Sequence, residues 1–381
     1  MADIAIVGGG VIGCATAFWL HRLRPQLRLI LLEAGALADG ASGRNAGFIL
    51  PGASADFLKD CSRYGETRAR RLWQFTRENR TLLARELDPR AFDWEDSGAL
   101  IVAGSAEEEK RLQEAVSWLR SDGAPAIFLS AAEINRRLRA RGYRGGLYLP
   151  EGGCLDPVAL VRYLADRSEA LVLTHHPVLA LEPCGDGVRL ETPYGSVRAG
   201  QVLLALNAYL PRLLPETAAY VRPVRAQMLA TEPAGRRWVP CPVYSHDGFF
   251  YLRQLADGTL LLGGARHLHL EEEVGYEDAT TEALQADLER YLHAYFPQTE
   301  GLRIQCRWSG TMGFSPDGLP VVDQVPGLEG SYWAAGFTGH GMGYGFRMGR
   351  LLAELLLGYT PDGYDLFARS HRSAFALERF G

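Results

Sequence analysis

Residues 4–13 of this chain read IAIVGGGVIG, and they decide the fold of its N-terminal part. Residues 4–7 are a short apolar run of β character, and a helical pattern continues from the glycines to about residue 23. A second apolar run, residues 27–32, ends in Glu33. The succession of strand, glycine turn, helix and strand predicts one parallel βαβ unit.

The glycines of this turn have the spacing G-x-G-x-x-G, and Glu33 follows the last of them by twenty residues. Gly8 permits the tight turn, Gly10 lets the backbone approach a pyrophosphate, and Gly13 lets the helix pack on the strand. The helix N-terminus then faces the phosphates, and Glu33 accepts the ribose hydroxyls. We therefore predict a dinucleotide site. An acid at position 33 disfavours a 2′-phosphate, and the motif leaves both NAD and FAD open.

Length and composition set the broad class. A chain of 381 residues predicts about two domains, and 47% hydrophobic with 22% charged residues is typical of globular proteins. The net charge of −5 gives no reason to expect nucleic acid as a partner. Six cysteines without a C-x-x-C pair favour free thiols in a reducing cytosol, so we expect a cytoplasmic protein. Residues 4–20 lack charge, but Asp3 precedes them and glycines interrupt them, so we expect neither a signal peptide nor a membrane span.

Two further segments are rich in glycine. Residues 40–52 read GASGRNAGFILPG, which has too many glycines for a helix or strand and too apolar an end for an exposed loop. Residues 336–345 read GFTGHGMGYG and precede a helical pattern over residues 346–357. Between them, residues 220–308 combine β-rich alternation with a long helical stretch, which predicts a second domain with an antiparallel sheet. The other expected helices are 66–85, 106–121, one beginning at the capping box of Ser130 and ending near 142, and 156–169; the other expected strands are 171–181, 188–191, 196–199 and 202–206.

Taken together, these segments resemble those of the FAD-dependent amine and amino-acid oxidoreductases of the D-amino-acid oxidase (DAO) superfamily. The gamma-glutamylputrescine oxidase, glycine oxidase and sarcosine oxidase types are the most similar. The segments occur in the same order and cover nearly the whole chain. They are AIVGGGVIG with Glu33, GASGRNAGFI, LDPVALVRYL with VLLALNAY, YLRQLADGTLLLGGAR at 251–266, WSGTMGFSPDGLPVVD at 308–323, and GFTGHGMGYG.

The resemblance implies an α/β Rossmann-type FAD-binding domain (GR2-like) and an α+β substrate domain with an antiparallel sheet. The FAD-binding domain is expected to be discontinuous, at residues 1–85, 151–219 and 309–381. The substrate domain is expected at residues 86–150 and 220–308.

The resemblance also implies FAD as the cofactor. The loop at 40–52 would follow FAD from the pyrophosphate, at Ser42 and Arg44, to the flavin, and the last glycine loop would aim a helix N-terminus at the pyrimidine edge of the flavin. Some members attach FAD to a cysteine where this chain has Gly310, so we expect non-covalent FAD. The residues expected to contact it are Gly8, Gly10, Val11, Ile12, Gly13, Glu33, Ala34, Ser42, Arg44, Asn45, Ala46, Gly47, Val178, Gly310, Gly339, His340, Gly341 and Met342.

Two departures from the family bear on the substrate and on the electron acceptor. Met312 stands where glycine-oxidase-like members have an arginine for the substrate carboxylate. Either Arg225, Arg253 or Arg266 replaces it, or the substrate is an amine without an α-carboxylate. Leu261 stands where sarcosine-oxidase-like members have a lysine for the reaction with O₂, which predicts a slow oxidase or another acceptor.

The activity implied is oxidation of a C–N bond in a primary or secondary amine or amino acid, by hydride transfer to flavin N5 and hydrolysis of the imine. The candidate catalytic residues are Tyr251, His340, Arg225 and His246, and Phe250, Tyr344 and Trp308 are further pocket candidates. No metal site is expected. The alternatives are the flavin subunit of a multi-subunit dehydrogenase and an NAD-linked dehydrogenase, which would leave the later segments unexplained.

Overall fold

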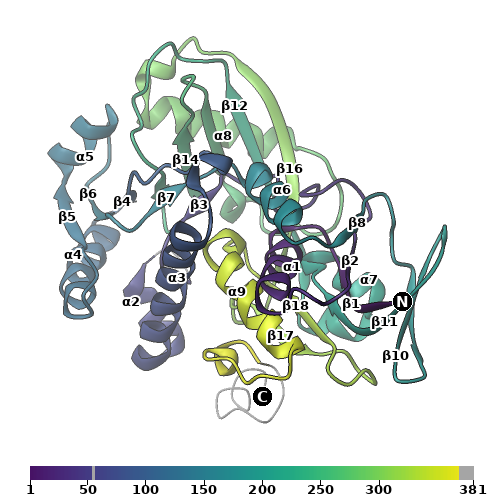
Figure 1. Cartoon of the computed structure of the whole chain (residues 1–381). Helices are drawn as coiled ribbons and strands as arrows, with labels where there is room; N and C mark the ends of the chain where they lie inside the picture. Colours follow the sequence, from purple (N-terminus) through teal and green to yellow (C-terminus); the bar gives the residue numbers. More distant parts are fainter. Residues whose placement is uncertain (54–55, 369–381) are drawn as a thin grey trace.

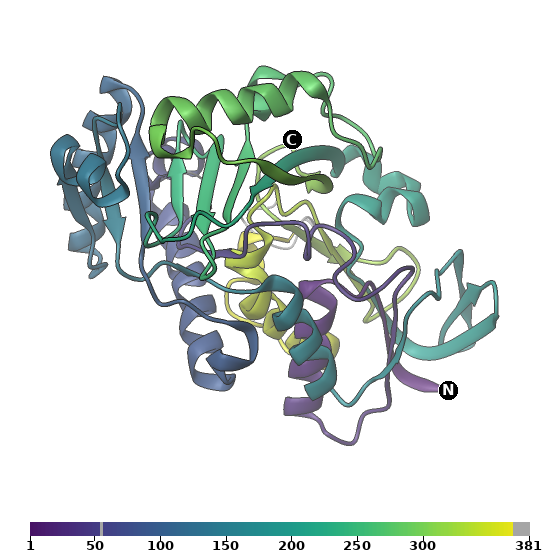
Figure 2. The same cartoon turned by 90° about the horizontal axis from the view of Figure 1, so that it is seen from above.

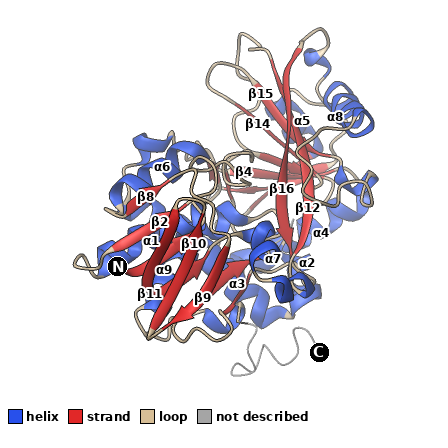
Figure 3. Ribbon diagram, turned by 90° about the vertical axis from the view of Figure 1, so that its right-hand side faces the viewer, coloured by secondary structure: helices blue, strands red, loops and turns tan. Residues whose placement is uncertain are grey.

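The first glycine motif lies at the centre of a parallel sheet, in a computed structural model that describes residues 1–53 and 56–368. In these residues β1 (Ala2–Val7) pairs in parallel with β2 (Leu29–Leu32) on one side and with β11 (Gly195–Leu204) on the other. The other strands of this sheet are β8 (Leu171–Leu173), β9 (Ala180–Cys184), β10 (Gly187–Thr192), β17 (Val321–Gln324) and β18 (Tyr332–Ala335). The order is β17-β18-β11-β1-β2-β8, and β10 and β9 extend β11 as an antiparallel ribbon (Figure 3).

Helices cover this sheet and meet closely at glycines. α1 (Val11–Leu23) packs against α9 (Gly341–Leu356), which packs in turn against α3 (Glu66–Glu86) (Figures 1 and 2). A Cβ atom at Gly349 would lie 2.5 Å from the Cβ of Ala15, so only glycine allows the two helix backbones to approach this far. α6 (Pro157–Arg167) packs against α1 as well.

The second sheet is antiparallel apart from one pair of strands. Its strands are β4 (Ala99–Ala103), β5 (Ile127–Ser130), β6 (Gly145–Leu149), β12 (Arg222–Thr231), β13 (Val243–Ser245), β14 (Phe250–Gln254), β15 (Leu260–Gly264) and β16 (Ile304–Phe314). Their order is β16-β12-β15-β14-β13-β4-β6-β5, with β4 and β13 parallel. Leu288 and Leu292 of α8 (Glu282–Tyr295) share an apolar core with Leu229 and Leu262 of the sheet. The predicted combination of an α/β and an α+β unit is therefore confirmed.

The remaining α-helices and strands of the described residues belong to neither of these two sheets. They are α2 (Phe57–Tyr64), α4 (Ala106–Ser121), α5 (Ala131–Leu138), α7 (Leu210–Leu213), β3 (Phe48–Ile49) and β7 (Gly153–Cys154), with β3 and β7 paired as a small ribbon. The predicted domain limit at residue 309 falls inside β16. Residues 369–381 of the third predicted segment lie outside the described residues.

Two local predictions differ from the structure, and a third is confirmed at its start but not at its end. The predicted strand 171–181 is interrupted between β8 and β9, where His175 has a φ of 57° and the chain leaves the sheet. α9 begins at Gly341 rather than at residue 346, because its glycines pack on α1 and this packing outweighs their low helix propensity. The capping box at Ser130 is confirmed with both of its hydrogen bonds, but the helix ends at Leu138 because Arg139 adopts a left-handed conformation.

The length and polarity of the helices bear on membrane insertion. Within residues 1–53 and 56–368, no helix combines the length and the apolar character that a membrane span requires.

Candidate active site

A cavity of about 900 Å³ lies between the two sheets. The carboxyl ends of β1 and β2 line it on one side, with Val7 and Leu32. Ala226, Tyr251 and Met312 of the second sheet line it on the other side. The volume is in the upper part of the range of about 300–1,000 Å³ for ligand sites, and the carboxyl edge of a parallel sheet is where ligands bind in open α/β folds.

The glycine turn forms a cradle at one part of this cavity. Gly8 has a φ of 115°, and a Cβ there would lie 2.5 Å from the carbonyl oxygen of Ala205. A Cβ at Gly10 would lie 2.9 Å from Ser42 Oγ, while one at Gly13 would overlap the carbonyl oxygen of Gly8. The turn therefore brings bare backbone and the N-terminus of α1 to the cavity wall. Gly13 itself is packed within the turn, where only glycine fits, and it does not line the cavity.

Glu33 lies at the end of β2, at the same wall. Its carboxylate accepts hydrogen bonds from the backbone N–H of Gly9, at 2.6 Å, and of Gly35, at 2.8 Å. These two bonds fix the acid beside the glycine turn. Val178 also lines the cavity, from the loop between β8 and β9 rather than from a strand as predicted.

The loop at 40–52 crosses the cavity between the sheets. Val11 N–H donates to Ser42 Oγ at 2.9 Å, so Ser42 caps the first amide of α1. Arg44 lines the cavity, and its Nη1 binds Asp278 Oδ2 at 2.6 Å and the carbonyl oxygen of Ser309 at 3.0 Å. Arg44 thus ties the loop to the second sheet.

Asn45 and Gly47 shape the next turn of this loop. Asn45 Nδ2 donates to the carbonyl oxygens of Ala41 and Ser42, and its Oδ1 accepts from Gly47 N–H at 2.7 Å. Gly47 has a φ of 71° and packs against the carbonyl of Leu155, which explains the glycine. Gly47, which was predicted to contact the cofactor, does not line the cavity.

The N-terminus of α9 forms another part of the wall, at Gly339, Gly341 and Met342. His340 lies at the N-cap of this helix, and its Nδ1 contacts the carbonyl oxygen of Thr338 at 2.9 Å. Burial lowers the pKa of His340, so the imidazole is neutral near pH 7. With Nδ1–H donating to Thr338, Nε2 is the unprotonated ring nitrogen.

Two tyrosines form the aromatic part of the chamber. Tyr244 and Tyr251 are paired across β13 and β14, and Phe48 contacts both rings, with centroid distances of 5.2 and 6.4 Å. A Cβ at Gly263 would overlap the ring of Tyr251, so Gly263 makes room for that ring on the sheet. Burial raises the pKa of Tyr251 to about 12 and that of Tyr244 well above its ordinary value. No hydrogen bond joins either hydroxyl to another described residue. The sequence prediction included Tyr251 and missed Tyr244.

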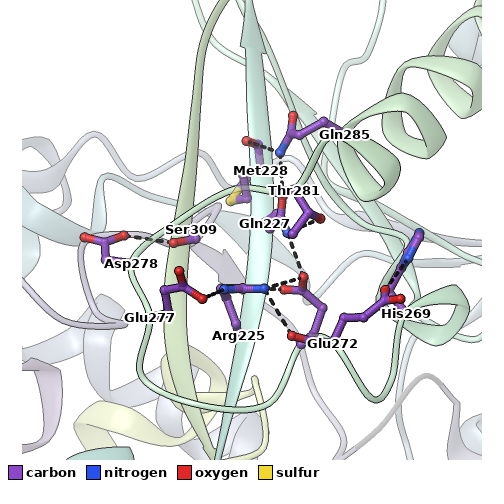
Figure 4. Close-up of polar contacts among 11 residues, drawn as sticks. Arg225, Gln227, Met228, His269, Glu272, Glu277, Asp278, Thr281, Gln285 and Ser309 are labelled. Carbon is purple, nitrogen blue, oxygen red and sulfur yellow. Dashed lines mark hydrogen bonds and ion pairs between the residues drawn. The ribbon is translucent and has the colours of Figure 1, made fainter.

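Arg225, a predicted catalytic residue, does not line the cavity. Its neighbour Ala226 does, and the alternation of β12 turns Arg225 and Gln227 to the opposite face. There Arg225 Nε donates to Glu273 Oε2 at 2.9 Å, and Gln227 Nε2 donates to Glu273 Oε1 at 2.7 Å (Figure 4). Glu273 is fully buried. This group therefore anchors the segment 266–281 to the sheet.

His269 provides a second anchor for this segment, and it predicts a pH dependence of stability. Nδ1 lies 2.9 Å from Glu272 Oε2 and Nε2 lies 2.7 Å from Asp287 Oδ2. Burial lowers the pKa of His269, but the bonds to Asp287 and Glu272 outweigh it and the net pKa is raised. Because the pKa is higher in the folded chain, protonated His269 stabilises the fold. This stabilisation is fully present below about pH 6.5, the pKa of histidine in the unfolded chain, and it is lost as the pH rises through the folded pKa. We expect His269→Gln to lower Tm at pH 5.5 more than at pH 8.5, measured by differential scanning fluorimetry. An equal loss at both values would show that protonation has no part in this anchor.

His246 and Phe250 pack in the core of the second unit. His246 Nε2 lies 3.0 Å from the hydroxyl of Tyr295, burial lowers its pKa, and it does not line the cavity. Phe250 stacks on Tyr291 at 4.0 Å, and Tyr344 is buried in the core of the first unit. Trp308 packs beside the chamber and donates from Nε1 to the carbonyl oxygen of Arg44 at 3.1 Å.

The remaining arginine, lysine and cysteine candidates differ in whether they line the cavity. Arg253 donates to the carbonyl oxygen of Leu155 and lies outside the cavity lining, whereas Arg266 is part of the lining. Lys59 Nζ pairs with Asp247 at 2.7 Å, and neither lysine lines the cavity. None of the six cysteines, all of which are described, lines it either, and Cys306 is exposed on β16.

Most predicted contacts thus converge on one cavity. Those that line it are Gly8, Gly10, Val11, Ile12, Glu33, Ala34, Ser42, Arg44, Asn45, Ala46, Val178, Tyr251, Gly310, Gly339, His340, Gly341 and Met342, and those that do not are Gly13, Gly47, Arg225 and His246.

Comparison with known proteins gives a family. The family model described as DAO, FAD dependent oxidoreductase, matches residues 3–355 of this chain. Gamma-glutamylputrescine oxidoreductase of Escherichia coli (strain K12) is 28% identical over 379 residues, covering 96% of this chain and 86% of the relative. Glycine oxidase of Geobacillus kaustophilus (strain HTA426) is 28% identical over 370 residues, covering 93% and 92%.

Solved structures have the same fold. The crystal structure of glycine oxidase from Geobacillus kaustophilus has a TM-score of 0.81 at 24% identity, over 98% of both chains. The crystal structure of L-proline dehydrogenase from P. horikoshii has a TM-score of 0.82 at 19% identity, over 99% of this chain and 98% of the other.

The geometry of the chain fits the family's cofactor. The bare glycine turn, the N-terminus of α1 and the acid at the end of β2 all face one cavity, as a dinucleotide requires. The match covers the segments that an NAD-linked dehydrogenase leaves unexplained, so that alternative is not favoured. This chain belongs to the DAO family of FAD-dependent oxidoreductases, and its cofactor is FAD.

Proposed function

We propose that the protein oxidises the C–N bond of a small amine or amino acid. The observation that carries this proposal is the continuity of the cavity from the Glu33 cradle to the chamber of Tyr244 and Tyr251. Such continuity allows a substrate to lie against the reactive end of a cofactor that is held at its other end by the glycine turn. The relatives named above, a gamma-glutamylputrescine oxidoreductase and a glycine oxidase, support the same chemistry.

When bound, FAD supplies the two-electron acceptor: a hydride leaves the carbon next to the nitrogen, the nitrogen loses a proton, and water hydrolyses the resulting C=N bond to a carbonyl compound and to ammonia or an amine. The residues that would hold it are the lining set of the glycine turn, Glu33, Ser42 and the N-terminus of α9. That helix end carries partial positive charge and would stabilise negative charge in the adjoining part of the cavity.

The chamber prepares the substrate rather than reacting with it. Phe48, Tyr244 and Tyr251 provide flat apolar walls that orient a small molecule and exclude water. Low polarity favours the uncharged form of an amine, which is the form able to lose a hydride. His340 is the only histidine among the lining residues of the described chain, and its unprotonated Nε2 is suited to accept a hydrogen bond from the substrate nitrogen.

The proposal is tested by product analysis with the purified holoenzyme. Sarcosine, glycine, D-proline, putrescine and gamma-glutamylputrescine are each supplied with an artificial electron acceptor, and with O₂ alone. We expect one compound to yield one carbonyl product for every two electrons transferred. Turnover by the chain alone would contradict the alternative of a flavin subunit that depends on a partner. Reduction of the acceptor without a carbonyl product would contradict C–N oxidation.

A further inference from the structure

We propose that Arg253 raises the reduction potential of the bound FAD by holding a buried positive charge behind the wall of the cavity. The inference concerns the cofactor and does not depend on which amine is oxidised. It starts from the burial of this side chain, which is only 9% exposed. Nη1 of Arg253 donates to the carbonyl oxygen of Leu155 at 2.7 Å, whereas its buried Nε has no hydrogen-bond partner among the described residues.

No acid in the described part of the chain forms an ion pair with Arg253. The side chain beside it is the thiol of Cys154, and burial raises the pKa of this thiol to about 11, so that it is neutral near pH 7. Glu95 also acts on the pKa of Cys154, but its carboxylate is bound by Arg237. The positive charge of Arg253 is therefore not cancelled by a partner of its own.

Two features place this charge directly behind the wall of the cavity. Arg253 follows Tyr251 by two residues on β14, and alternate residues of a strand share a face. Because Tyr251 lines the cavity, Arg253 lies on the cavity side of the sheet. The loop after the glycine turn covers it there, since a Cβ at Gly47 would lie 3.0 Å from Arg253 Nη1. Ala46 and Phe48, the neighbours of Gly47 in the chain, line the cavity, so one layer of loop backbone separates it from the guanidinium.

The surroundings of Arg253 fix its position and are apolar. Leu155 N–H donates to the carbonyl oxygen of Gly47 at 2.9 Å, so the residue that accepts from Arg253 is itself bound to the covering loop. Phe48 and Met228 are buried in one apolar cluster beside the chamber. A charge acts over a longer distance in such a medium than it does in water.

This charge favours the reduced state of the cofactor. A hydride carries two electrons and one proton, so its transfer from the substrate adds one negative charge to the cofactor. A fixed positive charge nearby stabilises that product relative to the oxidised state. Two unit charges about 10 Å apart, at an effective dielectric constant of about 20, change an equilibrium by about 10-fold.

The test is the midpoint potential of the FAD-loaded enzyme, measured without oxygen by slow reduction beside a reference dye of known potential. Arg253→Met removes the charge and keeps a long side chain, while Arg253→Gln also keeps a donor for Leu155. We expect each variant to lower the ratio of reduced to oxidised flavin at a given potential by about 10-fold, which is about 30 mV for a two-electron couple. Arg253→Lys keeps the charge and is expected to stay within about 3-fold of the parent.

The ratio separates charge from structure. A loop that is merely loosened binds the oxidised and the reduced cofactor more weakly by the same factor, and the potential then stays unchanged. Arg236→Gln is the matched control, because it removes a positive charge from an exposed position outside the lining, and we expect the parental potential.

Three results would each overturn the inference. They are a parental potential in both Arg253→Met and Arg253→Gln, an equal shift in Arg253→Lys, and an equal shift in Arg236→Gln. The measurement needs no amine, so its outcome is independent of the proposed function. If the potential falls as expected while no amine is oxidised, the role of Arg253 stands and the proposed function fails.

Discussion

Replacing Gly10 with valine is expected to leave a folded protein that binds FAD about 30- to 100-fold more weakly. Gly10 lines the cavity in an extended conformation that valine also adopts, so the backbone is not strained. A Cβ there lies 2.9 Å from Ser42 Oγ, and the two methyl groups beyond it enter the space where the backbone must meet the pyrophosphate. Overpacking a close contact costs about 1–3 kcal/mol, and the upper part of that range, about 2–3 kcal/mol, corresponds to the expected loss. FAD affinity is measured by flavin fluorescence on titrating the apoprotein.

Ser42→Ala separates the effect of added volume at position 10 from the effect of disturbing the Ser42 hydrogen bond. It removes the hydrogen bond from Val11 N–H without adding volume, so we expect it to weaken FAD by no more than about 10-fold. If Ser42→Ala reproduces the loss, the cap and not the volume carries the effect. If Gly10→Val keeps the parental affinity, the cavity wall at the glycine turn does not hold the pyrophosphate.

The second large effect concerns stability. Arg225→Met is expected to lower the free energy of unfolding by about 3–5 kcal/mol, because it leaves the carboxylate of Glu273 buried without its cation. The double variant Arg225→Met/Glu273→Gln removes the stranded charge and keeps an acceptor for Gln227, so we expect it to recover about 1–3 kcal/mol. Urea denaturation at saturating FAD measures both variants.

Arg222→Gln is the control, since it removes an exposed arginine from the same strand and should change stability by less than about 0.5 kcal/mol. A double variant that is less stable than Arg225→Met would show that the group acts through its hydrogen bonds and not through charge compensation.

The sequence predicted the elements whose signals are local. The strand, glycine turn, helix and acid of residues 4–33 form a self-contained unit, and the caps at Ser130 and Asp156 place helix starts within one or two residues. The start of α9 could not be read locally. Five glycines in ten residues disfavour a helix, and only packing against α1, a segment more than 300 residues away, makes Gly341 the first helical residue.

The second sheet shows why the substrate side was harder to predict. A strand presents alternate residues to opposite faces, so an error of one position in the prediction places a side chain in the cavity when it lies on the opposite face. Arg225 and His246 each lie one residue from a position that lines the cavity, Ala226 and Asp247 respectively. Tyr244 was missed because its pairing with Tyr251 depends on the register of β13 and β14, although both residues flank the same turn. The partner of Arg44, Asp278, is likewise distant in sequence.

We propose that one cavity of this protein brings FAD and an amine together for two-electron oxidation. The most direct measurement is the visible spectrum of the FAD-loaded enzyme while each amine of the panel is added without oxygen. We expect at least one amine of the panel to bleach the oxidised flavin band in a single turnover. A flavin that stays oxidised with every amine, or that never binds to the protein, would contradict it.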